Sequence, residues 1–185
     1  ITSGFLHVDF THLLFNMLTL YFFAQIVIDF FASPFTIFGD YSMMNMQVGM
    51  VLFAVLYLLS IVAGNLLALS VHKNEPYYSA VGASGGVSGI LFSVIAIKPT
   101  LMLGIFFIIP MPAWIFAVLY LAYSVYGMRK GLGNVGHAAH LGGAILGLAG
   151  TIIYFPEIFS INQFYILIML IPIGILLVMM LNKKD

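Results

Sequence analysis

Long apolar runs dominate this chain, and they constrain its fold more than any other feature. Hydrophobic residues make up 63% of the 185 residues and charged residues only 6%, whereas a soluble domain carries about 25% charged residues. A membrane helix needs about 20 consecutive apolar residues, and several runs reach or approach this length. The sequence therefore predicts an all-α fold, a polytopic bundle of about six transmembrane helices.

Polar and proline-containing breaks set the expected bounds of these helices. The expected helices are residues 10–31, 47–70, 83–97, 112–128, 137–155 and 163–181. The third is short for a full span, so we expect its first residues to lie below the membrane surface. The apolar run 101–109 ends in Pro110-Met111-Pro112, and proline disrupts helices. We therefore expect an interfacial or extended connection there.

Neither an internal repeat nor a second domain is visible, so we expect one membrane domain over residues 1–185. Residues 1–155 would form its core, and residues 163–181 an additional C-terminal transmembrane helix. The net charge of zero argues against a nucleic-acid partner. The absence of cysteine excludes disulfides, thiolate catalysis and cysteine-based zinc sites. We expect no cofactor and no metal, and the lipid bilayer as a constant partner.

Two polar residues stand at the starts of apolar helices. Ser84 lies in Gly82-Ala83-Ser84-Gly85-Gly86, and His140 begins a later glycine-lined helix. An ionisable residue within a membrane helix is a functional hypothesis by default, and a histidine that accepts a serine proton is the usual way to activate that nucleophile. The pair therefore predicts a nucleophile and its base inside a membrane.

Glycines accompany both residues and predict how the two helices meet. Gly143 and Gly147 follow His140 at steps of three and four, so they share its helix face. Gly82 and Gly85 flank Ser84. Small residues let membrane helices approach closely, so these four glycines are expected to pack the helices together. The plainer alternative is that both motifs serve helix packing alone, because small-xxx-small patterns are common in membrane helices.

Acyl transfer also needs hydrogen-bond donors for the developing oxyanion. His12 and Asn16 lie four residues apart on the first helix, so both can donate from one face. The amide of Ser84 at its helix N-terminus would be a third donor. Interfacial anchoring of His12 and an interhelical hydrogen bond of Asn16 are the structural alternatives. No acidic residue falls in mid-helix, so we expect a neutral Ser-His dyad and a solvated Asp9.

The motifs together resemble the rhomboid intramembrane serine proteases. They are the segments His7-Val8-Asp9-Phe10-Thr11-His12-Leu13-Leu14-Phe15-Asn16, Gly82-Ala83-Ser84-Gly85 and His137-Ala138-Ala139-His140-Leu141-Gly142-Gly143. The resemblance implies that Ser84 is the nucleophile and His140 the general base. It implies an oxyanion hole of His12, Asn16 and the Ser84 amide. The implied substrates are transmembrane segments of other membrane proteins, cut through an acyl-enzyme.

Two departures from the family pattern stand out. Rhomboids carry a transmembrane helix and a long loop before the first histidine motif, and we expect that first helix to be missing from this trimmed part of a longer protein. The family also often has an aromatic residue one turn after the nucleophile, which packs on the catalytic histidine. This chain has Ser88 there, so the orientation of His140 must be fixed in another way.

The location of the site follows the family. We expect a multi-pass protein of the cell membrane with its active site towards the extracellular side. The positive-inside rule favours the reverse, because most basic residues fall at the Ser84 end of the predicted topology. That end holds Lys73, Arg129, Lys130, Lys183 and Lys184, and the other end only Lys98.

Two other functions fit parts of the pattern. One is a metal or proton transporter that uses His7, His12, His137 and His140, since histidine is a common metal ligand. That hypothesis leaves Gly-Ala-Ser-Gly unexplained and finds no carboxylate or cysteine beside the histidines. The other is a catalytically inactive rhomboid-like protein that binds membrane clients, against which the intact Ser84 and His140 argue.

Overall fold

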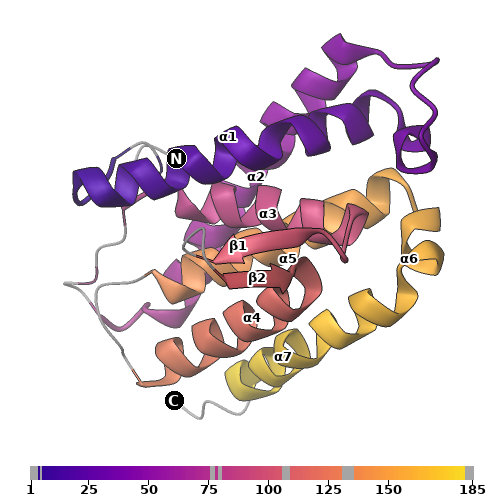
Figure 1. The fold of residues 1–185 in the computed structure, drawn as a ribbon. Helices are drawn as coiled ribbons and strands as arrows, with labels where there is room; N and C mark the ends of the chain where they lie inside the picture. The colour runs from indigo at the N-terminus through magenta and orange to yellow at the C-terminus, as the bar shows by residue number, and fades with distance from the viewer. Residues whose placement is uncertain are drawn as a thin grey trace.

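A computed structural model describes Gly4, residues 6–75, Tyr78 and residues 81–105, 109–130 and 136–181. The chain folds into an all-α bundle with one small β-hairpin (Figure 1). The elements are α1 (Phe10–Ala32), the 3-10 helix η2 (Pro34–Phe38), α2 (Met46–Val71), α3 (Ser84–Ile97), β1 (Met102–Ile105), β2 (Ile109–Pro112), α4 (Ala113–Lys130), α5 (His137–Tyr154), α6 (Glu157–Ile161) and α7 (Gln163–Leu181).

The helix bounds follow from local chemistry. The Asp9 carboxylate caps α1 by accepting the amide of His12 at 2.7 Å, which satisfies a backbone donor that has no partner within the helix. Asn45 caps α2 in the same way, through the amide of Val48 at 3.2 Å. The six predicted helices are all present, with ends that differ from the expected ones by at most two residues.

The predicted extended connection after α3 is a paired structure. β1 and β2 run antiparallel, with Met102 opposite Pro112 and Gly104 opposite Pro110. A two-stranded sheet has only edge strands, so the prolines remove no hydrogen bond from a central strand. Leu103 points into the protein and is 8% exposed. The pairing of β1 with β2 was not predicted, because it depends on contacts with the core.

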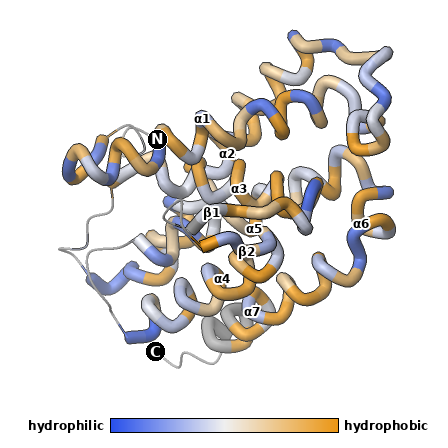
Figure 2. Tube along the Cα trace, viewed as in Figure 1, coloured by the Kyte–Doolittle hydropathy of each residue, from blue (hydrophilic) through white to orange (hydrophobic). Residues whose placement is uncertain are grey.

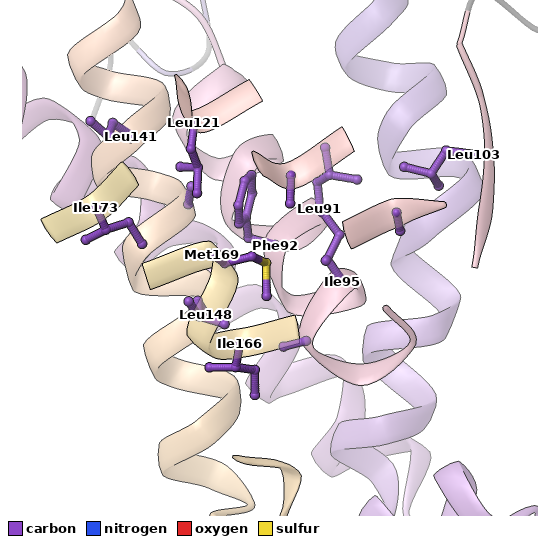
Figure 3. Packing of buried hydrophobic residues seen from close by; sticks show 14 of the residues in the cluster. Leu91, Phe92, Ile95, Leu103, Leu121, Leu141, Leu148, Ile166, Met169 and Ile173 are labelled. Carbon is purple, nitrogen blue, oxygen red and sulfur yellow. The ribbon is translucent and has the colours of Figure 1, made fainter. Parts of the chain in front are cut away.

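Helices α3 and α5 form the centre of the bundle. Every residue of α3 after Ser84 is buried, which explains how so short a helix can stand inside a membrane. α1 and α2 lie on one side of the pair, and α4 and α7 on the other (Figure 1). Between α3, α5, α4 and α7 a dense core forms (Figure 3), with Phe92, Leu121, Leu141 and Met169 among its members.

Three described helices are long and apolar enough to cross a membrane: α1, α2 and α5. α3 and the segment Gln163–Ile175 of α7 are apolar but shorter. α1 and α2 consist largely of hydrophobic residues (Figure 2), and many of their large apolar side chains are exposed, for example Tyr21, Val51 and Leu66. Large exposed apolar surface of this kind is stable only against lipid or another apolar partner. The chain is therefore an integral membrane protein.

Candidate active site

The α3 and α5 backbones touch each other along a line of glycines. A β-carbon at Gly143 would lie 2.7 Å from the carbonyl carbon of Gly85 and 3.1 Å from its Cα. One turn further along, a β-carbon at Gly147 would lie 2.6 Å from the carbonyl carbon of Gly89. Carbon atoms are in favourable contact at about 3.5–4.0 Å, so only glycine permits this approach.

This contact brings the start of α3 against the start of α5. Ser84 directly precedes Gly85, and His140 lies one turn before Gly143. A β-carbon at Gly85 would be 3.3 Å from the carbonyl oxygen of Ala139, the residue before His140. Both Ser84 and His140 are described, and no hydrogen bond joins their side chains in this structure. Catalytic hydrogen bonds are often long without substrate.

His12 reaches the same place from α1. A β-carbon at Gly82 would lie 3.0 Å from His12 Nε2 and 3.6 Å from Ser84 Oγ, so the imidazole and the hydroxyl border one space. Gly82 also has a φ of +130°, a conformation that favours glycine. Gly82 was expected to pack two helices together. It lies instead in the turn before α3, where it admits the ring of His12.

Asn16 is the buried polar residue of α1, with 6% of its surface exposed. Its Nδ2 donates to the carbonyl oxygen of His12 at 3.0 Å, which uses one of the two amide hydrogens. Among the described residues the second hydrogen has no protein acceptor. Asn16 therefore keeps one donor, one helical turn from His12.

The other two histidines of the motifs support their neighbours. The ring of His7 stands edge-on to that of His12, with centroids 5.2 Å apart. His137, the first residue of α5, is buried against α4, where a β-carbon at Gly127 would collide with its ring, and its ring meets that of Tyr123 edge-on with centroids 5.2 Å apart. Within the described part of the chain, no three His, Asp or Glu side chains gather as a metal site requires.

Sequence reasoning missed an aromatic neighbour of His140. The ring of Tyr120, from α4, lies nearly parallel to the imidazole, with centroids 6.0 Å apart and an interplanar angle of 25°. Its hydroxyl is 2.7 Å from Ser88 Oγ. An aromatic residue in an apolar membrane helix carries no sequence signal for such a role, and only the fold shows it.

The segment that leads to Ser84 is tied to the end of α2. Tyr78 stacks on His72, with ring centroids 3.6 Å apart and an interplanar angle of 6°. His72 Nδ1 also lies 2.9 Å from a carboxylate oxygen of Glu75. Burial raises the pKa of the Tyr78 phenol, and the charge of Glu75 raises it further. Tyr78 therefore stays neutral at physiological pH.

Comparison with known proteins identifies the family. A family model described as the Rhomboid domain matches residues 1–157. The chain belongs to the rhomboid family. RHOMBOID-like protein 12, mitochondrial, of Arabidopsis thaliana is 28% identical over an alignment of 159 residues that covers 78% of this chain and 42% of the relative. Rhomboid protein 1, mitochondrial, of Saccharomyces cerevisiae is 31% identical over an alignment of 153 residues that covers 80% of this chain and 39% of the relative. No solved structure matches.

Family membership confirms the resemblance seen in the motifs. This rhomboid chain spans about two fifths of the length of the two relatives, by the coverage of 42% and 39%. Both relatives carry the word mitochondrial in their names. The expected place in a membrane is therefore supported, whereas the cell membrane in particular is not.

Proposed function

We propose that this rhomboid is an intramembrane serine endopeptidase that cuts transmembrane segments of other proteins. The observation that carries the proposal is the meeting of three elements at one end of the bundle. The Ser84 hydroxyl and the His12 imidazole border the space beside Gly82, and the start of α5 with His140 packs on the start of α3. Helix packing alone explains the glycines but gives no reason for these polar side chains to converge there.

In the proposed reaction, Ser84 Oγ attacks a peptide carbonyl carbon of the substrate and its proton passes to His140. The tetrahedral intermediate collapses, the C–N bond breaks, and His140 returns the proton to the leaving amine. Water, with His140 again as base, then hydrolyses the acyl-enzyme ester. The products are a carboxylate, an amine and the free serine.

The start of α3 suits the developing negative charge. Ser84 is the first residue of the helix, and Ala83 before it provides no side-chain cap. The first amides of a helix have no intrahelical acceptor, and the helix dipole favours an anion there. With His12 and the second hydrogen of Asn16, the Ser84 amide would complete the oxyanion hole. Losing one such donor typically lowers kcat about 10²–10³-fold.

The test uses a fluorophosphonate probe on the purified chain in detergent, which reacts with activated serines. We expect labelling of the wild type, and none after Ser84→Ala or His140→Ala. The matched control is Ser70→Ala, which removes an exposed serine at the end of α2. It should label like the wild type. A silent wild type would refute the proposal and favour the client-binding function.

A second experiment identifies the substrate class. The chain and a single-pass protein, with glycine or proline near one end of its transmembrane segment, would be reconstituted in liposomes. Mass spectrometry of the products should show a cut within or beside that segment, absent with Ser84→Ala. Cleavage only of soluble loops would contradict an intramembrane substrate.

The side of the membrane that holds the site is a further part of the proposal. We propose that the Ser84 end faces away from the cytoplasm, as the family resemblance implies. The chain has no cysteine, so single cysteines at Asn74, near Ser84, and at Thr100, at the far end of α3, can be labelled without background. A membrane-impermeant maleimide added to spheroplasts that contain the protein should label only Asn74→Cys; labelling only of Thr100→Cys would contradict the proposed orientation.

A further inference from the structure

His140 has to be held at a fixed angle to serve as a base, and the structure shows one ring that stacks on it. Position 88 is one turn after the nucleophile on α3, but a serine cannot pack on an imidazole from there. The ring that lies nearly parallel to His140 comes from a different helix: Tyr120 of α4, at a centroid distance of 6.0 Å. The hydroxyl of Ser88 bonds to that ring's hydroxyl at 2.7 Å.

The contacts of Tyr120 fix its ring on several sides. Phe92 of α3 and Phe116 of α4 both lie with their centroids 5.7 Å from that of Tyr120. The hydroxyl end is held by Ser88, which is 3% exposed. A phenol and a buried hydroxyl each need a hydrogen-bond partner, and here each supplies the other's. The hydrogen bond to Ser88 therefore fixes the position of the Tyr120 ring, and this ring lies nearly parallel to the His140 imidazole.

We propose that Tyr120 and Ser88 form a positioning pair that holds the His140 imidazole for its reaction with Ser84. The proposal rests on the proposed protease function. Neither residue touches the reacting atoms. Tyr120 acts by limiting the rotation of the His140 ring, and Ser88 acts by anchoring Tyr120. The anchoring bond also ties α4 to α3 beside the site.

The experiment measures the rate of fluorophosphonate labelling of the whole chain in detergent. Tyr120→Leu removes the ring and should slow labelling about 10- to 100-fold, since a misplacement of about 1 Å can cost about 10²-fold. Tyr120→Phe keeps the ring and loses only the hydrogen bond to Ser88. It should therefore label faster than Tyr120→Leu, and about three- to tenfold more slowly than the wild type. Ser88→Ala should match Tyr120→Phe. The two together should be no slower than either alone, because both break one bond.

A control separates positioning from a general loss of structure. Tyr123→Leu removes the next tyrosine along α4, which contacts His137 and not His140, and should label at the wild-type rate. With a cleavable transmembrane peptide, Tyr120→Leu should lower kcat and leave KM unchanged.

The outcomes distinguish this inference from the proposed function. If the wild type labels, His140→Ala does not, and Tyr120→Leu labels at the wild-type rate, the protease proposal stands and the positioning pair is refuted. If the wild type fails to label, both are refuted. Melting temperatures identify a folding defect in Tyr120→Leu. If Tyr120→Leu has a folding defect, the labelling rates of Tyr120→Phe and Ser88→Ala test the proposal instead. Wild-type rates in both variants would refute the positioning pair.

Discussion

Substituting Gly143 with alanine tests whether the contact between α3 and α5 sets the site. The new β-carbon would lie 2.7 Å from the carbonyl carbon of Gly85, where a relaxed contact needs about 3.5 Å. The carbonyl oxygen of Gly85 would lie closer still, so the two backbones must separate by more than about 1 Å. Overpacking of this kind typically costs about 1–3 kcal/mol, so the free energy of unfolding should fall by that amount.

The same separation of α3 and α5 should also slow the reaction of Ser84. Gly85 adjoins Ser84, and Gly143 lies one turn from His140, so the separation would open the distance between nucleophile and base. A displacement of about 1 Å can cost about 10²-fold in rate. We expect Gly143→Ala to slow fluorophosphonate labelling by about 100-fold while the protein stays folded. Unfolding in mixed micelles by a denaturing detergent measures the stability.

Two glycines of the same helix serve as controls. A β-carbon at Gly147 meets the Gly89 backbone as closely, but one turn further from the site. Gly147→Ala should therefore destabilise the fold similarly and slow labelling less. A β-carbon at Gly150 meets only the end of the Leu56 side chain, at 2.7 Å, so Gly150→Ala should be nearly neutral. If Gly143→Ala behaved like Gly150→Ala, the reasoning would be refuted.

Three further predictions concern single contacts. Gly82→Ala should slow labelling at least tenfold, because alanine disfavours a φ of +130° and its methyl group would meet the His12 ring; a wild-type rate would contradict this. Asn16→Ala should lower kcat by about 10²–10³-fold with KM unchanged, as expected for an oxyanion donor; a change in KM alone would contradict that role. Ser93→Ala should cost about 0.5–1.5 kcal/mol of stability, because it removes the buried bond of 2.6 Å to Thr151 while the Thr151 hydroxyl keeps its bond to the Gly147 carbonyl oxygen; an unchanged free energy of unfolding would contradict this.

The helices could be predicted because their cause is local. The length of an apolar run predicts a membrane helix, and a proline or a polar break predicts where that helix ends. Asp9 and Asn45, the caps of α1 and α2, are polar residues of the type that precedes helices. The hairpin was predicted only as an extended connection, because the pairing of β1 with β2 depends on Leu103 reaching a core built from other helices.

The candidate site was predictable where one helix face carries the pattern. The steps from His140 to Gly143 and Gly147 predict a contact surface, and the structure shows that surface against α3. The same helix also approaches the α2 backbone closely. A β-carbon at Gly142 would lie 2.6 Å from the carbonyl oxygen of Ala63. Adjacent helical residues point in different directions, so Gly142 and Gly143 serve two different partners, and spacing along one face could not reveal the second.

The groups around Ser84 are therefore held in two different ways. Ser84 and His140 stand on α3 and α5, whose backbones meet through glycines with no side chain between them. His12 and Tyr120 come from the helices on either side, and each meets α3 or the turn before it through its side chain: His12 against Gly82, and Tyr120 through Ser88 and Phe92. A small displacement of α1 or α4 would thus move the proposed oxyanion donor His12 or change the orientation of the proposed base His140 while the α3–α5 contact stays intact. The glycine spacing in the sequence predicts the rigid contact between α3 and α5. The contacts of His12 and Tyr120 depend on single side chains, and no such spacing predicts them.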